Sequence, residues 1–122
     1  MLASINGTDI TPYIQESSYE ANDVGEYEEW KDGNRRKHRT KLRSAVEGSF
    51  SLVFVTATAL NSFLTLLENN STAAKLITMR LYIQNTNTTG DYDVFYEFEN
   101  TDSRQISTDY FYKKFRFSFE ER

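Results

Sequence analysis

The chain has 122 residues, a formal net charge of −4, no cysteine and one proline, and 15% of its residues are aromatic. This length allows one hydrophobic core, so we expect a single domain over residues 1–122. The lack of cysteine excludes a disulfide framework, a thiolate metal site and a cysteine nucleophile. The negative charge argues against nucleic acid as the main partner, and the aromatic content favours half-buried β-sheet surfaces.

Residues 1–20 predict a short hairpin around the turn dipeptide Asn6-Gly7. Pro12 follows in the second strand of this hairpin and confines that strand to the edge of a sheet, because proline has no backbone donor. The first residues contain no basic segment that leads into an apolar run, and no stretch approaches the roughly 18 apolar residues of a membrane span. We therefore expect a protein that is made in a cytoplasm, with no membrane among its partners.

Residues 22–43 predict a long hairpin in which an acidic strand leads to Asp32-Gly33 and a basic strand returns. Asp-Gly is a strong signal for a two-residue type I′ turn, because glycine adopts a positive φ without steric cost. Cross-strand pairs of opposite charge contribute roughly 0.2–1 kcal/mol each. A turn at these two residues places Lys31 opposite Asn34, Trp30 opposite Arg35, Glu29 opposite Arg36, Glu28 opposite Lys37, Tyr27 opposite His38 and Glu26 opposite Arg39.

This hairpin has little to bury, since its large apolar residues are Val24, Tyr27 and Trp30. An isolated two-stranded hairpin is only marginally stable in water. Our hypothesis is that the hairpin projects from a compact domain and becomes fully ordered against a partner. The alternative is a mobile, solvated loop whose charges cancel one another.

Residues 43–55 alternate between apolar and polar side chains, which predicts a long strand with one solvated face. Gly48 marks a bulge or a close contact in this strand. Val53 and Val55 interrupt the polar side and indicate burial on both faces near its end.

Residues 57–68 change to a helical period, and either Thr56 or Thr58 can cap the first turn. The apolar stripe that this helix needs to bury consists of Leu60, Phe63, Leu64 and Leu67.

Alternating patterns over 75–84 and 92–99 predict a second hairpin, followed by a loop at 100–103 and a last strand over 110–121. The fold class that follows is mainly β (α+β). We expect an antiparallel β-sandwich or half-barrel with one packed helix at about 57–68 and a protruding hairpin at about 22–43.

The sequence offers no nucleophile with a base, no metal cluster and no phosphate-binding loop, so we expect neither an enzyme nor a cofactor. His38 lies in the charged hairpin, where a solvated cross-strand partner is the more ordinary role. Neighbouring carboxylates such as Glu28 and Glu29 point to opposite faces of a strand and cannot share a proton.

Three kinds of partner remain open. One is a sugar or another protein bound by an aromatic platform of Tyr92, Tyr96, Tyr110, Tyr112 and Trp30, and the second is the phosphate backbone of DNA along the basic run from Arg35 to Arg43. Protein partners explain both signs of charge, because the acidic strand of one copy can meet a basic surface of the next and head-to-tail contacts that close give a ring. The candidate assembly residues are Glu26, Glu28, Glu29, Trp30, Asp32, Gly33, Arg35, Arg36, Lys37 and Arg39.

Four blocks of the sequence carry a resemblance. They are Ile5-Asn-Gly-Thr-Asp-Ile-Thr-Pro-Tyr-Ile14, Asp32-Gly-Asn-Arg-Arg-Lys-His-Arg-Thr-Lys-Leu42, the helix with Leu66-Leu67, and Phe115-Arg-Phe-Ser-Phe-Glu-Glu-Arg122. Together they resemble small virion proteins encoded in the tail-morphogenesis region of long-tailed phages and prophages of Gram-positive bacteria. That family is similar to the tail-tube and distal-tail β-sandwich group, whose subunits build rings, commonly hexameric. The resemblance implies a virion tail protein that binds copies of itself and other tail or connector proteins through the hairpin at 22–43.

Overall fold

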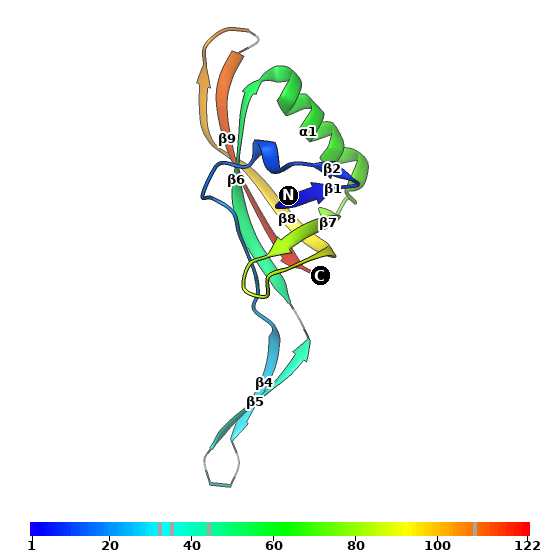
Figure 1. The fold of residues 1–122 in the computed structure, drawn as a ribbon, viewed down its shortest axis with the longest axis vertical. Helices are drawn as coiled ribbons and strands as arrows, with labels where there is room; N and C mark the ends of the chain where they lie inside the picture. Colours follow the sequence, from blue (N-terminus) through cyan, green and yellow to red (C-terminus); the bar gives the residue numbers. More distant parts are fainter. Residues whose placement is uncertain (32, 35, 44, 109) are drawn as a thin grey trace.

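The computed structural model describes residues 1–31, 33–34, 36–43, 45–108 and 110–122, with the backbone alone at 26–28 and 37–42. It confirms a mainly β fold with one α-helix (Figure 1). The elements in chain order are β1 (Ala3–Ile5), β2 (Thr8–Asp9), the 3₁₀ helix η1 (Thr11–Tyr13), β3 (Glu20–Asp23), β4 (Glu26–Lys31), β5 (Lys37–Arg43), β6 (Val46–Thr56), α1 (Ala57–Asn70), β7 (Leu76–Ile83), β8 (Thr88–Gln105) and β9 (Tyr110–Glu121).

Seven strands form one antiparallel sheet in the order β2-β1-β7-β8-β9-β6-β3, while β4 and β5 form a separate two-stranded sheet. The large sheet curls until β3 approaches the end of β7, where the amide of Gln84 donates a hydrogen bond of 2.8 Å to the carbonyl of Ala21. The Tyr19 hydroxyl strengthens this junction, since it lies 2.7 Å from the Tyr82 carbonyl oxygen and 3.1 Å from that of Leu2. The result is a half-barrel whose sheet stays open.

The N-terminal hairpin forms around Asn6-Gly7, as predicted. Both residues have a positive φ, 48° and 79°, as a type I′ turn requires, and Ile5 pairs with Thr8. Pro12, expected in the second strand, lies instead in η1, because β2 already ends at Asp9. Proline fits the first turn of a helix, where its missing N–H has no partner to lose.

Strand β6 shows the expected alternation, and Gly48 marks a close contact. A Cβ atom at residue 48 would lie 2.0 Å from the carbonyl oxygen of Glu20, so the backbone of β3 occupies the space of a side chain. The expectation of burial on both faces near the end of β6 is wrong, because 55% of Val55 is exposed.

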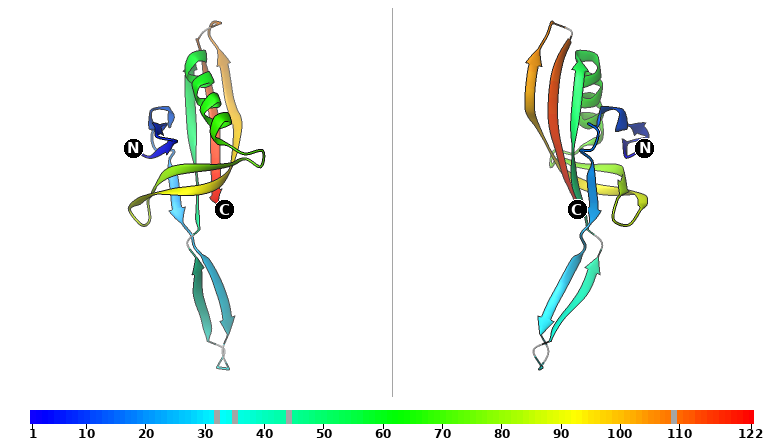
Figure 2. Two further views of the ribbon diagram at one scale, coloured as in Figure 1. Left: turned by 90° about the vertical axis from the view of Figure 1, so that its right-hand side faces the viewer. Right: turned by 60° about the vertical axis from the view of Figure 1, so that its left-hand side comes forward.

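Helix α1 begins one residue after Thr56, whose hydroxyl accepts a hydrogen bond of 3.3 Å from the amide of Ala59, and it ends two residues beyond the predicted limit. It lies against the concave side of the sheet (Figure 2). Phe63 carries the contact, with its ring 5.4 Å from that of Phe54 and 5.7 Å from that of Phe98. Leu64, expected in the buried stripe, is 40% exposed.

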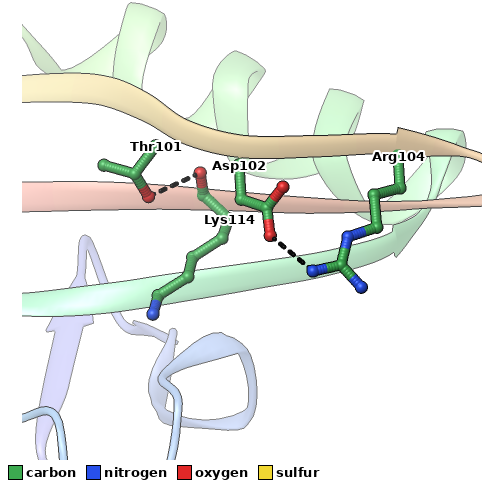
Figure 3. A network of polar contacts seen from close by, with 4 residues as sticks. All are labelled: Thr101, Asp102, Arg104 and Lys114. Atoms are coloured by element: carbon green, nitrogen blue, oxygen red, sulfur yellow. Dashed lines mark hydrogen bonds and ion pairs between the residues drawn. The ribbon is translucent and has the colours of Figure 1, made fainter.

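The hairpin of β7 and β8 is confirmed, but the predicted loop at 100–103 is wrong. Strand β8 continues through this region with a register shift between Asn100 and Asp102, so Thr101 is the extra residue of a β-bulge. Figure 3 shows how side chains support it: the Thr101 hydroxyl donates to the Lys114 carbonyl at 3.1 Å, and Asp102 pairs with Arg104 at 3.2 Å. Polar turn-like residues are accommodated in a strand because the bulge leaves one of them unpaired.

Candidate functional site: the protruding hairpin

The hairpin of β4 and β5 extends away from the half-barrel in every view (Figures 1 and 2). Its strands cover 26–31 and 37–43, and the first two residues of the predicted hairpin, Asn22 and Asp23, belong to β3 in the large sheet. Among the residues whose burial is described, the buried hydrophobic core lies wholly outside 26–43. The body therefore has a complete core that does not need the hairpin.

The predicted register of the hairpin is wrong by three residues. Five residues, 32–36, connect the strands, and Gly33 lacks the positive φ that a type I′ turn requires; Asp32 and Arg35 lie outside the described residues. The observed pairs are Lys31 with Lys37, Trp30 with His38, Glu29 with Arg39, Glu28 with Thr40, Tyr27 with Lys41 and Glu26 with Arg43.

The register follows from the root of the hairpin and not from its tip. Strand β3 pairs with β6 so that Asp23 lies opposite Val46. Two residues then separate Asp23 from Glu26 and two separate Arg43 from Val46, so the pairing of the large sheet continues to Glu26 and Arg43, after which a bulge shifts the register by one residue. The Asp-Gly dipeptide indicates only a local preference for a tight turn. The sheet pairing overrides this preference because the pairing involves many more residues than the turn does.

The oppositely charged residues that face each other in the hairpin differ from those predicted. In the observed register, Glu29 lies opposite Arg39 and Glu26 opposite Arg43, in place of the three predicted pairs. Lys31 and Lys37 are like charges opposite each other, an arrangement that destabilises a hairpin. A contribution from outside the hairpin would offset this cost.

Asp23 organises the root of the hairpin. Its carboxylate accepts hydrogen bonds of 3.0 Å from the amides of both Gly25 and Ala45. These bonds join the two segments of the hairpin where they leave the body. Gly25 has a φ of 67°, which favours glycine at this bend. The side chain of Asn85, from the turn between β7 and β8, pairs with the backbone of Asp23 through bonds of 2.9 and 2.8 Å.

A second anchor joins the hairpin to the C-terminus, where the guanidinium of Arg43 donates a bond of 2.7 Å to the carbonyl of Arg122. Of these root residues, Arg43 was a candidate on sequence grounds, as the last member of the basic run from Arg35 to Arg43, whereas Asp23, Gly25, Ala45 and Asn85 were not. The one available signal was Asp23 two residues before Gly25, a spacing at which an Asp side chain often accepts from the backbone.

The structure separates the residues proposed as an aromatic platform. Tyr96 is partly buried and stacks on the core residue Phe117 at 5.2 Å. Tyr110 is 60% exposed and begins β9, whose start lies at the opposite end of the molecule from the hairpin that carries Trp30, 46% exposed (Figure 1). Tyr92 is half-buried, and burial raises its pKa, with a further rise from the negative charges of Glu121 and Asp23. These aromatic residues do not form one surface.

Within the described part of the chain, no group of three or more acidic or histidine side chains is placed to hold a metal ion. No helix there is long and apolar enough to cross a bilayer. No family model matches the chain, and neither a curated protein nor a solved structure similar to it was found. The geometry of the protein and the resemblance of its sequence blocks therefore carry the functional argument.

Proposed function

We propose that the protein is a non-enzymatic structural subunit of a phage tail or tail-like particle, which assembles with copies of itself into a ring through the β4–β5 hairpin. The observation that carries this proposal is the hairpin, which leaves a body whose described core is complete without it. A two-stranded hairpin alone is marginal in water, and this one includes the like-charged pair Lys31 and Lys37. A surface supplied by a neighbouring subunit would give it additional contacts.

The charge distribution favours copies of the same chain as partners. The hairpin carries three carboxylates in Glu26–Lys31 and four Lys or Arg residues in Lys37–Arg43, so one element offers both signs of charge. Such complementarity gives register and a fast encounter more than raw affinity. A hairpin that docks on a different surface of the next copy makes a head-to-tail contact, which closes into a ring or continues as a filament.

The placement in a tail, and the expected contacts with other tail or connector proteins, rest on the resemblance of the four sequence blocks. Localisation is tested in particles purified from a culture that expresses the surrounding genes. We expect the chain in intact tails by mass spectrometry and by antibody labelling in electron micrographs. Labelling confined to heads or to free protein would contradict the tail assignment.

The assembly proposal is tested by replacing residues 26–43 with a short Gly-Asn turn. The body should keep its fold, monitored by circular dichroism, because its described core lies elsewhere. Sedimentation velocity over a range of concentrations should show oligomers of the unchanged chain and monomers of the shortened one. An unchanged chain that stays monomeric at all concentrations, or a shortened chain that still assembles, would contradict the proposal.

A further inference from the structure

A groove of about 660 Å³ lies on the face of the large sheet opposite to α1. Its floor consists of β6 and β9, one wall is β3, and the other includes Phe95 and Lys75. We call it the outer groove. Two of its apolar side chains are unusually accessible, since 39% of Phe95 and 46% of Val24 are exposed. A groove of this size on an otherwise uncovered sheet face can receive several side chains of a partner.

The arrangement of charges in the outer groove lowers the stability of the isolated subunit. Glu47 and Glu120 lie directly opposite each other on β6 and β9, and like charges in this position destabilise a sheet. Glu20 and Glu97 add two further exposed carboxylates to the lining. The positive side chains that line the same groove, Lys75 and Arg116, are fewer than its carboxylates.

The chain carries the complementary element. Residues 33–43 contain no carboxylate, and this stretch includes Arg36, Lys37, Arg39 and Lys41. The hairpin joins the C-terminal end of β3 to the N-terminal end of β6, two strands whose residues line the outer groove. It extends away from the half-barrel (Figure 2). Strand β5 of one chain therefore cannot fold back into the groove of the same chain.

We infer that the outer groove is the receptor for strand β5 of a second copy's hairpin, with the basic stretch 36–43 meeting the carboxylates of Glu47 and Glu120. This inference rests on the proposed self-assembly and names its two contacting surfaces. Each copy would donate its hairpin to one neighbour and accept a hairpin from the other. The apolar patches of Phe95 and Val24 would pack against the aliphatic stems of the incoming basic residues.

A charge exchange between the two surfaces tests the inference on the full chain. The groove variant carries Glu47→Lys and Glu120→Lys, and the hairpin variant carries Lys37→Glu and Lys41→Glu, two positions that face no carboxylate in β4. Each variant alone should associate more weakly than the unchanged chain by more than about tenfold, because like charges now meet. An equimolar mixture of the two, and one chain with all four substitutions, should assemble again in sedimentation velocity.

The matched control is Glu16→Lys with Glu68→Lys, which makes the same change in net charge at exposed positions outside the outer groove. It should assemble like the unchanged chain, and the groove variant should melt at about the same temperature as the unchanged chain, because one like-charged pair at positions 47 and 120 replaces another. Assembly of the groove variant at full strength, while the hairpin variant stays monomeric, would overturn the groove as receptor and leave the proposed function standing. An unchanged chain that is monomeric throughout would overturn both.

Discussion

At Gly48, the backbone of the neighbouring strand leaves no space for a side chain. A Cβ atom there would lie 2.0 Å from the Glu20 carbonyl oxygen and 2.8 Å from the Cα of Ala21, both backbone atoms of β3. Space cannot be made by turning a side chain, so the two strands would have to separate. The close approach of β3 to its neighbour β6 depends on this glycine.

We predict that Gly48→Ala lowers the free energy of unfolding by about 1–3 kcal/mol, the usual range for overpacking. Gly33→Ala is the matched control, because a Cβ at residue 33 meets nothing within 4 Å and the φ of Gly33 is not positive. It should stay within about 0.5 kcal/mol of the unchanged chain in urea denaturation. Equal stabilities of the two variants would show that β3 does not approach β6 so closely at residue 48.

Tyr19 couples the junction between β3 and β7 to pH. Burial raises the pKa of its hydroxyl above the ordinary value of 10.0, and the neutral hydroxyl donates to the backbone at Tyr82. The unfolded chain therefore loses this proton at lower pH than the folded one. The stabilisation is complete below pH 10 and is lost as the pH rises from there towards the folded pKa.

We predict that Tyr19→Phe lowers stability by about 1 kcal/mol near neutral pH, since a hydrogen bond is lost. Above about pH 10, the melting temperature of the unchanged chain should fall more steeply than that of the variant. Thermal melts between pH 7 and pH 11 measure both effects, and the other tyrosines and lysines contribute equally to the two proteins. Parallel curves over this range would contradict the assigned titration.

At the scale of elements, the junction between hairpin and body depends on Asp23. Its carboxylate joins Gly25 to Ala45, and Asn85 holds its backbone against the β7–β8 turn. Asp23 thus connects both segments of the hairpin to the body as a clamp. Together with the bond from Arg43 to the Arg122 carbonyl, these contacts hold the root of the hairpin against the body.

We predict that Asp23→Ala weakens the hairpin while the body stays folded. Loss of the acceptor should lower the local stability by about 1–2 kcal/mol, which corresponds to a roughly fivefold to thirtyfold faster amide exchange over 26–43. Hydrogen–deuterium exchange read by mass spectrometry resolves the hairpin from the body. Asp23→Asn keeps an acceptor oxygen and should retain most of the protection; equal exchange in Asp23→Ala and the unchanged chain would refute the clamp.

At the scale of the whole molecule, the proposed assembly brings together surfaces of opposite charge. The screening length of salt solutions falls from about 10 Å at 0.1 M to about 3 Å at 1 M. We therefore predict that oligomers of the unchanged chain weaken steadily as sodium chloride is raised, as measured by sedimentation. Association that is constant or stronger in high salt would indicate contacts dominated by apolar surface, such as Ile106 and Tyr110 at the far end.

Much of the fold is predictable from short-range patterns. The alternation in β6, β7 and β9, the helical period over 57–68 and the Asn6-Gly7 turn each report a preference that the surrounding structure reinforces. Where a pattern is ambiguous, the prediction is wrong: residues 100–103 look like a loop but form a bulged strand, because β9 continues beside them. The existence and protrusion of the charged hairpin were also predictable, because its sequence shows little alternation of apolar and polar residues and contains few large apolar side chains.

By itself, then, the sequence determined a β-rich single core, one helix and a charged hairpin outside that core, because composition and periodicity act locally. Only the tertiary structure decided the register of the hairpin, the clamp at its root and the outer groove. Asp23 and Asn85 are 62 residues apart in the chain. Glu47 and Glu120 belong to β6 and β9, two strands that are neighbours in the sheet but distant in the sequence. Such contacts form when distant strands pair, and no local preference of either residue encodes them.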